Sequence, residues 1–146
     1  MDFKRLYIDE IVMYESKINI LLSELLKDKN DLLASCNENI IKYSQDGSAY
    51  IFGCIENNEL IGFLWAYKKN FANQLRLHIS YLIIDEKYRS KGLGKKLICE
   101  LEKVAKEEDI NYIDLFVNKD NTKAQKFYER VSFENERILM RKKLGL

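Results

Sequence analysis

The stretch from His78 to Asn118 limits the fold of this chain more than any other part of its sequence. It begins with a strand-like run whose second half, Tyr81 to Ile84, is apolar on both faces, as in a central strand covered on both sides. A loop with two glycines follows, then a run with apolar residues at helical spacing, then a second strand-like run. Strands joined through a helix in this way lie parallel, with a right-handed crossover. The sequence therefore predicts a parallel pair of strands with a helix between them.

The remaining periodicities predict helices and strands around this unit. Two β-rich runs on either side of an Asn-Asn turn predict a hairpin, and apolar residues at helical spacing predict two helices in the first third. In chain order, the expected elements are helices over 8–28 and 31–43, strands over 49–56, 59–69 and 75–84, a helix over 93–108, a strand over 111–118, a helix over 121–130 and a strand over 133–144. The expected fold class is α/β or α+β, with a mixed, mostly antiparallel central sheet and helices on both faces.

The composition suits one globular domain in a reducing compartment. A chain of 146 residues has the size of a single domain with one core, so residues 1–146 are expected to form one domain. No apolar run is long enough to cross a bilayer, and the N-terminus lacks the apolar stretch of a secretory signal. Cys36, Cys54 and Cys99 are far apart and odd in number, which favours reduced thiols and a cytoplasmic location. One histidine and no paired cysteine motif leave no expected metal site.

The charge distribution favours a small anion over a nucleic acid as the partner of this chain. Lysine and arginine number 24 against 23 acidic residues, a net charge of +1, whereas a nucleic-acid binder usually carries a strong basic excess. The basic charge gathers around the glycine loop instead, at Lys87, Arg89, Lys91, Lys95 and Lys96. A nucleic-acid or protein adaptor that uses this loop is a less favoured alternative.

The segment YRSKGLGKK, from Tyr88 to Lys96, has the chemistry of an anion site. The first N–H groups of a helix lack partners within the helix, and the helix dipole adds positive partial charge there, so phosphate oxygens suit this position. Gly92 and Gly94 lack a Cβ atom, which lets the backbone approach a phosphate closely. The segment matches neither the Walker A pattern nor the G-x-G-x-x-G pattern of dinucleotide-binding loops. A basic turn that only caps a helix is the alternative interpretation.

A second segment, NKDNTKAQKFYERVSF from Asn118 to Phe133, identifies a family. Together with the loop it resembles the GNAT family of acyl-CoA-dependent N-acyltransferases, over most of the chain and most specifically from Tyr81 to Phe133. The family's loop pattern, (Arg/Gln)-x-x-Gly-x-(Gly/Ala), is matched in full from Arg89. Its second pattern, Asn-x-x-Ala-x-x-(Leu/Phe)-Tyr-x-x-x-Gly-Phe, is matched from Asn121 at all but one position. The departures from patterns common in the family are Glu86 for proline, Ser90 for glycine and Ser132 for glycine.

The resemblance implies that the chain binds acetyl-CoA or another acyl-CoA as cosubstrate, with no metal. The pyrophosphate would lie on the backbone amides of the loop, at Arg89, Ser90, Lys91, Gly92, Leu93, Gly94 and Lys95. The pantetheine arm would bond like an added strand, because the parallel strands of the family splay apart, at Leu82, Ile83 and Ile84. Asn121 is expected both to cap the following helix and to contact the pantetheine arm, and Asn118 is the weaker candidate for such a contact.

The resemblance also assigns catalytic groups. A primary amine, with a pKa of about 10, is mostly protonated at neutral pH, so acyl transfer needs a base for the amine and an acid for the leaving thiolate. Tyr128 resembles the family's general acid, and an aromatic core residue is the alternative. His78 stands where some members carry a general-base glutamate, and a histidine, with an ordinary pKa of about 6.5, could do the same work. The alternatives are a histidine with only a structural hydrogen bond and a water relay ordered by Ser80 and Tyr81.

The expected function is transfer of an acetyl group from acetyl-CoA to a primary amine of a small molecule or peptide, by direct attack. The alternative is a non-catalytic acyl-CoA-binding module. No residue pattern identifies the acceptor or the acyl-chain preference. The first two helices, the turn near Asn73 and the last strands are expected to determine the acceptor, and Trp65, Tyr67 and Phe71 either line its side or pack in the sheet. Members of the family often dimerise, so the resemblance allows a homodimer, but no residue pattern identifies the oligomeric state.

Overall fold

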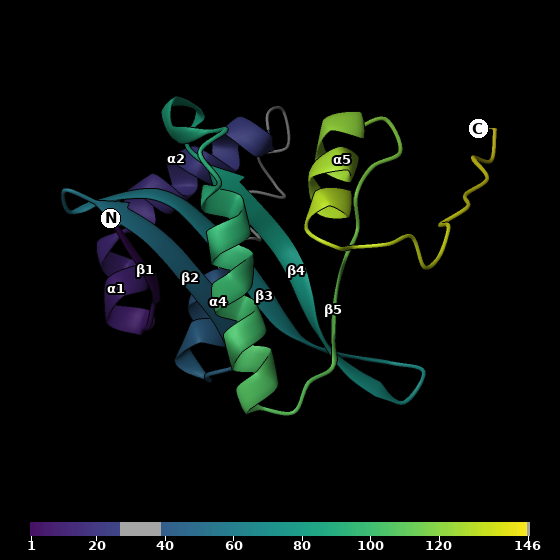
Figure 1. The fold of residues 1–146 in the computed structure, drawn as a ribbon, viewed down its shortest axis with the longest axis horizontal. Coiled ribbons are helices and arrows are strands. Elements are labelled where there is room, and N and C mark those ends of the chain that lie inside the picture. The colour runs from purple at the N-terminus through teal and green to yellow at the C-terminus, as the bar shows by residue number, and fades with distance from the viewer. Residues whose placement is uncertain (27–38, 146) are drawn as a thin grey trace. The chain divides into compact units, whose positions relative to one another are not determined.

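The computed structural model describes residues 1–26 and 39–145 of the chain. It divides into two compact units, a sheet unit over Met1–Phe116 and a C-terminal unit over Val117–Leu146. The sheet unit holds a five-stranded sheet in the order β1-β2-β3-β4-β5 (Figure 1). Its strands are β1 (Asp2–Arg5), β2 (Ala49–Glu56), β3 (Glu59–Phe71), β4 (Gln74–Ile84) and β5 (Tyr112–Leu115). Neighbouring strands are antiparallel except β4 and β5, which form the predicted parallel pair.

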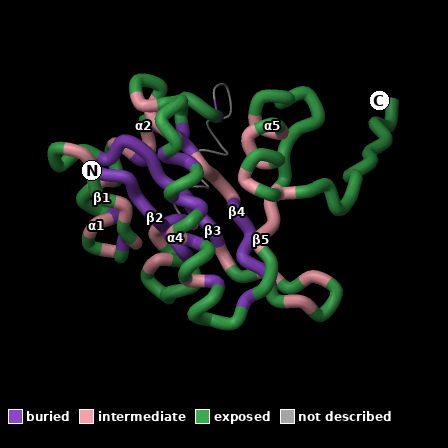
Figure 2. The backbone as a smooth tube through the Cα atoms, viewed as in Figure 1, coloured by how far each residue is buried: buried purple, intermediate pink, exposed green. Residues whose placement is uncertain are grey.

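Helices cover both faces of this sheet. The helical elements of the sheet unit are α1 (Ile8–Met13), α2 (Glu15–Leu25), a stretch over 39–45, the 3-10 helix η1 (Glu86–Tyr88) and α4 (Leu93–Glu107). Apolar residues of α1 and α2 form one cluster with Phe63 and Trp65 of β3. Leu64 and Ala66 alternate with these residues and point to the opposite face, where α4 packs, and both are fully buried. The buried backbone in Figure 2 accordingly runs along β2, β3 and β4 between the two layers.

Two tight turns join the antiparallel strands. Asn57 and Asn58, with φ angles of 51° and 63°, form the turn between β2 and β3, and Ala72 and Asn73, with 50° and 65°, form the turn between β3 and β4. Consecutive positive φ angles match the right-handed twist of a hairpin, and asparagine accepts them more readily than most residues do. The hairpin predicted around the Asn-Asn pair is therefore confirmed.

The parallel pair separates before β4 ends. β5 pairs with β4 only from Arg76 to Ile79, while β4 continues along β3 as far as Ile84. A register shift opposite Trp65 and Ala66 leaves Ser80 as an extra residue on β4, at the point where β5 stops pairing. Such a bulge sharpens the twist of a strand. Within the described residues, the end of β4 therefore presents backbone groups on the side that β5 leaves.

The N-terminal elements differ from the prediction. Instead of one helix over 8–28, α1 and α2 are separate, and they meet at Tyr14, whose side chain packs against the core cluster. The edge strand β1 was not predicted, because its four residues, DFKR, carry too few apolar side chains to show an alternation. Pairing with β2 gives this segment its strand geometry. Of the helix predicted over 31–43, residues 39–43 are helical, and 31–38 lie outside the described residues.

The C-terminal unit contains α5 (Thr122–Arg130), close to the helix predicted over 121–130. The strand predicted over 133–144 is wrong, since these residues form neither helix nor strand. Ile138, Leu139 and Met140, which suggested that strand, are each more than four-fifths exposed. A strand requires a neighbouring ladder to satisfy its backbone, and this segment has none among the described residues. No described helix of either unit is long and apolar enough to cross a membrane.

Candidate active site

The glycine loop follows the end of β4 and the short 3-10 helix η1, which Asp85 holds in place. Asp85 caps η1, with its Oδ1 accepting a hydrogen bond from the backbone N–H of Lys87 at 3.1 Å and its carbonyl oxygen accepting one from Tyr88 at 2.9 Å. The other carboxylate oxygen lies 2.6 Å from Nζ of Lys17 on α2. The Lys17 hydrogen bond, followed by that of the Lys87 amide, lowers the pKa of Asp85. An ionised Asp85 therefore ties α2 to the start of the loop.

The loop itself presents a row of backbone donors. None of the N–H groups from Ser90 to Lys95 has an acceptor within residues 1–26 and 39–145, and the first such bond of α4 runs from Lys96 to the carbonyl of Gly92 at 3.2 Å. Ser90 and Gly92 have positive φ angles of 65° and 75°, and Gly92 is the N-cap of α4. Successive amides that converge at a helix N-terminus bind anions. The loop thus has the donors that the predicted anion site requires, and the site itself stays a prediction.

The basic side chains around the loop have different tasks. Nε of Arg89 donates to the carbonyl oxygen of Ile84 at 2.9 Å, so Arg89 clamps the loop back onto the end of β4. The ammonium groups of Lys91 and Lys96 lie over the rings of Tyr88 and Phe3, at 5.3 and 5.4 Å from the ring centroids. The ammonium of Lys96 is thus directed toward β1, whereas that of Lys91 stays with Tyr88 at the start of the loop.

The predicted pantetheine strand lies directly before the loop. Leu82 and Ile84 are half-buried, Ile83 is buried in the core cluster, and all three pair with β3 on one side. On the other side β5 has already ended, because its last partner on β4 is Ile79. The structure therefore brings Leu82, Ile83 and Ile84 next to the loop, along an edge where an extended ligand could add as a strand.

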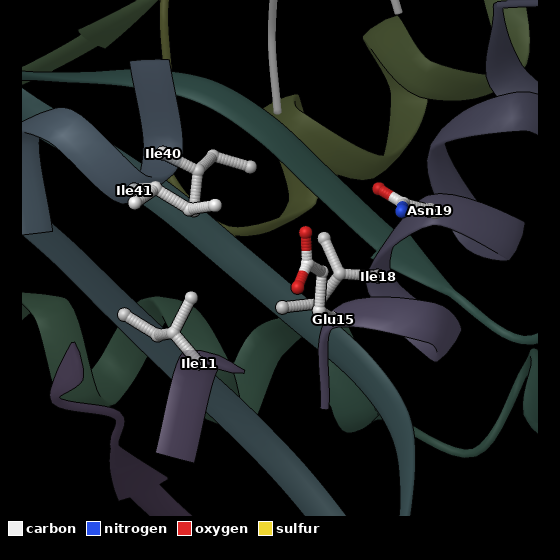
Figure 3. A pocket seen from close by; sticks show the side chains of 6 residues that line it. All are labelled: Ile11, Glu15, Ile18, Asn19, Ile40 and Ile41. Carbon is white, nitrogen blue, oxygen red and sulfur yellow. The ribbon is translucent and has the colours of Figure 1, made fainter. Parts of the chain in front are cut away.

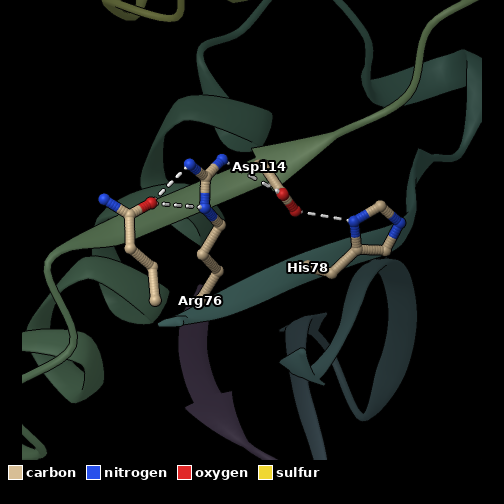
Figure 4. A network of polar contacts seen from close by, with 4 residues as sticks. Arg76, His78 and Asp114 are labelled. Carbon is tan, nitrogen blue, oxygen red and sulfur yellow. Dashed lines mark hydrogen bonds and ion pairs between the residues drawn. The ribbon is translucent and has the colours of Figure 1, made fainter. Parts of the chain in front are cut away.

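His78 lies in a polar network that sequence reasoning did not find. Its Nδ1 lies 2.6 Å from Oδ1 of Asp114 on β5, and Oδ2 of the same carboxylate lies 3.5 Å from Nη1 of Arg76 (Figure 4). Gln74 accepts from Nε and Nη2 of Arg76 at 3.2 and 2.6 Å. His78 and Asp114 are direct partners in the parallel register, which a chain separation of 36 residues concealed. Aligning the predicted parallel strands would have been the way to find Asp114 beside His78 from the sequence.

Trp65, Tyr67 and Phe71 of β3 each contact another ring or a cation. Trp65 is 5% exposed and stacks on Tyr81 at a centroid distance of 5.7 Å, which agrees with packing in the sheet. Tyr67 lies 5.2 Å from the ring of His78, and its pKa is raised, first by burial and then by the nearby charge of Asp114. Phe71 lies under the guanidinium of Arg76 at 4.8 Å.

Tyr128 lies on α5, and the C-terminal cap of that helix accounts for the spacing of Tyr128, Ser132 and Phe133 in the sequence pattern. The N–H of Phe133 donates to the carbonyl of Tyr128 at 2.9 Å, and the N–H of Ser132 donates to that of Glu129 at 3.1 Å. This pair of bonds is a Schellman motif, and the rings of Tyr128 and Phe133 supply its apolar contact at 5.4 Å. Ser132 takes the left-handed position, with φ of 75°, where the family pattern has glycine. Burial raises the pKa of Tyr128, so its phenol keeps its proton at neutral pH.

The cap of α5 was predicted correctly. Oδ1 of Asn121 accepts from the N–H of Ala124 at 3.1 Å, as an N-cap does. The carbonyl of Asn118 accepts from Nε2 of Gln125 at 2.9 Å and from the N–H of Asn121 at 3.0 Å, so Asn118 shapes the turn into the helix. The contact of Asn121 with pantetheine stays a prediction.

Two further findings concern a small cavity in the sheet unit and metal ligands in the described residues. A cavity of about 10 Å³ lies between α1, α2 and the 39–45 helix, lined by Ile11, Glu15, Ile18, Asn19, Ile40 and Ile41 (Figure 3). This volume holds about one water molecule, so neither a coenzyme nor an amine acceptor fits there. In the described part of the chain, no group of three or more His, Cys, Asp or Glu side chains could hold a metal ion.

Comparison with known sequences identifies the family. The model of the acetyltransferase (GNAT) family matches residues 17–133. The uncharacterized N-acetyltransferase YdgE of Bacillus subtilis is 30% identical over 109 residues, 73% of this chain and 69% of that protein. The spermidine N(1)-acetyltransferase of Thermoplasma acidophilum is 33% identical over 99 residues, 67% and 59% respectively. The uncharacterized N-acetyltransferase YycN of Bacillus subtilis is 29% identical over 90 residues, 62% of this chain and only 58% of YycN.

Comparison with solved structures agrees on the fold. The aminoglycoside acetyltransferase AAC(6')-Iy, in complex with a CoA bisubstrate analog, superposes with a TM-score of 0.78 at 18% identity, over 99% of this chain and 98% of that one. The aminoglycoside acetyltransferase meta-AAC0020 from a soil metagenomic sample gives a TM-score of 0.78 at 20% identity, over 99% and 95%. At these identities the likeness concerns the fold alone. Because the family model spans most of the sequence, this chain belongs to the acetyltransferase (GNAT) family, whose members use acetyl-CoA.

Proposed function

We propose that this protein transfers an acetyl group from acetyl-CoA to a primary amine by direct attack of the amine on the thioester. One observation carries the cosubstrate assignment: the row of backbone N–H groups from Ser90 to Lys95, at the start of α4, that have no acceptor within residues 1–26 and 39–145. These donors suit a pyrophosphate, because its oxygens supply several acceptors and its charge interacts favourably with the helix N-terminus. Arg89 supports the site indirectly, through its bond to the carbonyl of Ile84.

The pantetheine arm is assigned to the free edge of β4. Leu82, Ile83 and Ile84 lead directly into the loop, and their outer edge lacks β5. Amide groups of pantetheine would therefore bond to this edge as a strand bonds to its neighbour. In this arrangement the thioester lies toward Ser80, where the parallel strands separate.

The chemistry requires two proton transfers. The lone pair of the neutral amine forms the N–C bond, the C–S bond breaks as the tetrahedral intermediate collapses, and the thiolate of CoA leaves. His78 is assigned as the base that takes the amine proton, and Tyr128 as the acid that protonates the thiolate. Tyr128 can fill this role because its phenol is protonated at neutral pH, and burial, which raises its pKa, does not remove that proton.

The relatives indicate which acceptors to test first. Spermidine, peptide N-termini and aminoglycosides are the amines named for the spermidine N(1)-acetyltransferase, for the catalytic subunit NAA20 of the Arabidopsis thaliana N-terminal acetyltransferase B complex, and for the aminoglycoside acetyltransferases. The assay mixes the protein with acetyl-CoA and one amine of each class, and follows release of free thiol. Tyr128→Phe is the first variant, because it removes only the phenolic hydroxyl.

Wild-type turnover that falls by about 10²-fold or more in Tyr128→Phe, with acetyl-CoA binding unchanged, supports an enzyme with Tyr128 as its acid. Unchanged turnover in the variant removes Tyr128 from that role. Binding of acetyl-CoA without wild-type turnover on any of these amine classes would favour the alternative, a non-catalytic acyl-CoA-binding module.

A further inference from the structure

We propose that Asp114 is a positioning residue that holds the proton of His78 on Nδ1 and leaves Nε2 free to accept the proton of the attacking amine. Arg76 in turn holds Asp114 in place. This inference rests on the proposed function, since it gives His78 its task. It adds to that function a pair of residues that acts through His78 without touching the substrate.

The sheet places His78 and Asp114 side by side. They are register partners in the parallel pair of β4 and β5, so their side chains project from the same face. Nδ1 of His78 and Oδ1 of Asp114 lie 2.6 Å apart. A carboxylate only accepts hydrogen bonds, so this contact places a proton on Nδ1, and in the neutral ring that proton is the only one. The lone pair of the ring is then on Nε2.

The second ring nitrogen is in a position to act. Nε2 has no hydrogen-bond partner within residues 1–26 and 39–145. The side chain as a whole is 6% exposed, and its ring lies between those of Tyr67 and Phe116, each at 5.2 Å. These rings oppose rotation of the imidazole. His78 also lies two residues before Ser80, where β4 and β5 separate.

Arg76 keeps the carboxylate in its orientation. Its guanidinium lies between the rings of Phe71 and Tyr112, at 4.8 and 5.0 Å, and donates twice to Gln74. Its Nη1 lies 3.5 Å from the carboxylate oxygen that does not face His78 (Figure 4). Arg76 is 4% exposed, and a buried guanidinium needs a counter-charge. Asp114 therefore also has a structural task, from which the test must separate its effect on His78.

The proton balance of the step is simple. The amine proton moves to Nε2 as the N–C bond forms, which gives an imidazolium with a proton on each nitrogen. The Nδ1 proton stays on the ring and donates to Asp114 throughout. The carboxylate stabilises the positive charge on the ring until Nε2 returns its proton to solvent, as in other enzymes where an aspartate orients a histidine base.

The chain offers a direct test because it contains one histidine. Nitrogen-15 NMR of protein labelled at histidine therefore reports the tautomer of His78 without assignment and without knowledge of the acceptor. At a pH where the ring is neutral, we expect the wild type to carry its proton on Nδ1. A wild-type ring with its proton on Nε2 overturns the proposal, whether or not any amine is acetylated.

Asp114→Asn tests the cause of that tautomer. The variant side chain offers an amide donor to Nδ1, so we expect the proton to move to Nε2. The matched control is Asp109→Asn, the same change at an exposed residue after α4, which should leave the spectrum as in the wild type. Because Asp114→Asn also removes the counter-charge of Arg76, the double variant Arg76→Gln/Asp114→Asn is measured beside it, with circular dichroism as the check of folding. A folded variant of either kind with the wild-type tautomer overturns the role of Asp114.

Kinetics with an amine that the wild type acetylates completes the test. We expect Asp114→Asn and His78→Gln each to lower kcat by about 10²-fold or more, with acetyl-CoA affinity retained. The double variant His78→Gln/Asp114→Asn should be no slower than His78→Gln, because Asp114 acts only through His78. If the fold-losses in kcat of the two single variants multiply in the double variant, the two residues act independently and the proposal is overturned. A wild-type protein that does not bind acetyl-CoA would instead contradict the proposed function. The NMR result would still report the tautomer of His78.

Discussion

Ser132 ends α5 in a conformation that favours glycine, and Ser132→Gly should stabilise the protein. Ser132 follows the C-cap Val131 with φ of 75°, and its N–H and that of Phe133 close the two bonds of a Schellman motif. Both bonds use backbone atoms, so neither depends on the serine side chain. The substitution therefore removes the strain of a Cβ atom in the left-handed region without removing a hydrogen bond of the motif.

The size of the effect follows from two opposing terms. A residue with a Cβ atom loses about 1–2 kcal/mol in the left-handed region. Glycine offsets part of this gain, because it adds about 0.4–1 kcal/mol of conformational freedom to the unfolded chain. The free energy of unfolding should therefore rise by about 0.5–1 kcal/mol, which corresponds to a rise in Tm of about 2–3 °C for a chain of this size.

Urea unfolding followed by circular dichroism measures this gain. The matched control is Ser23→Gly, the same change at an exposed position inside α2, where glycine should lower the free energy of unfolding by about 0.5 kcal/mol. A rise in the free energy of unfolding for Ser132→Gly together with a fall for Ser23→Gly supports the strain at Ser132. A Ser132→Gly protein no more stable than the wild type would refute the reasoning, and changed turnover would show that the serine side chain helps to aim Tyr128.

Two further predictions concern the end of β4 and the loop that follows it. The Lys17 hydrogen bond lowers the pKa of Asp85, so the charge of Asp85 stabilises the fold above its unfolded-state pKa of about 3.9, and this contribution is lost as the pH falls through the lower folded-state value. The difference in unfolding free energy between wild type and Asp85→Asn should therefore shrink as the pH falls from about 5 to below 3, and a constant difference would count against the ion pair. In Gly62→Ala, the new Cβ would lie 2.6 Å from Cδ1 of Ile84 and 3.0 Å from a backbone oxygen of β4, which should lower the unfolding free energy by about 1–3 kcal/mol. Gly145→Ala, with nothing within 4 Å, should unfold like the wild type, and equal midpoints for the two variants would disprove the crowding at Gly62.

Local signals in the sequence predicted much of the fold. The Asn57-Asn58 turn, the amphipathic run of α4 and the cap at Asn121 each depend on residues close in the chain, and the structure has all three features. The parallel pair followed from the handed connection between strands. These features are set by backbone conformation and periodicity, which one sequence can display.

The features that sequence reasoning missed depend on contacts between distant segments. β1 is a strand because β2 lies beside it, and the break at Tyr14 follows from packing on the core cluster, with no proline or glycine to mark it. The apolar residues around Leu139 suggested a strand that has no partner among the described residues. Asp114 was missed for the same reason, because its importance to His78 appears only when β4 and β5 are aligned.

Acetyl-CoA binding to the loop is the central claim, and calorimetry on a matched pair of glycine variants tests it most directly. Gly92 and Gly47 have φ angles of 75° and 77°, and a Cβ at either position would meet nothing within 4 Å. Gly92→Glu and Gly47→Glu should therefore strain the backbone equally, whereas only the first places a carboxylate beside the free amides. We predict that the wild type and Gly47→Glu bind acetyl-CoA alike, and that Gly92→Glu binds at least about tenfold more weakly through charge repulsion. Equal affinity in the two variants, or no binding by the wild type, would contradict the account.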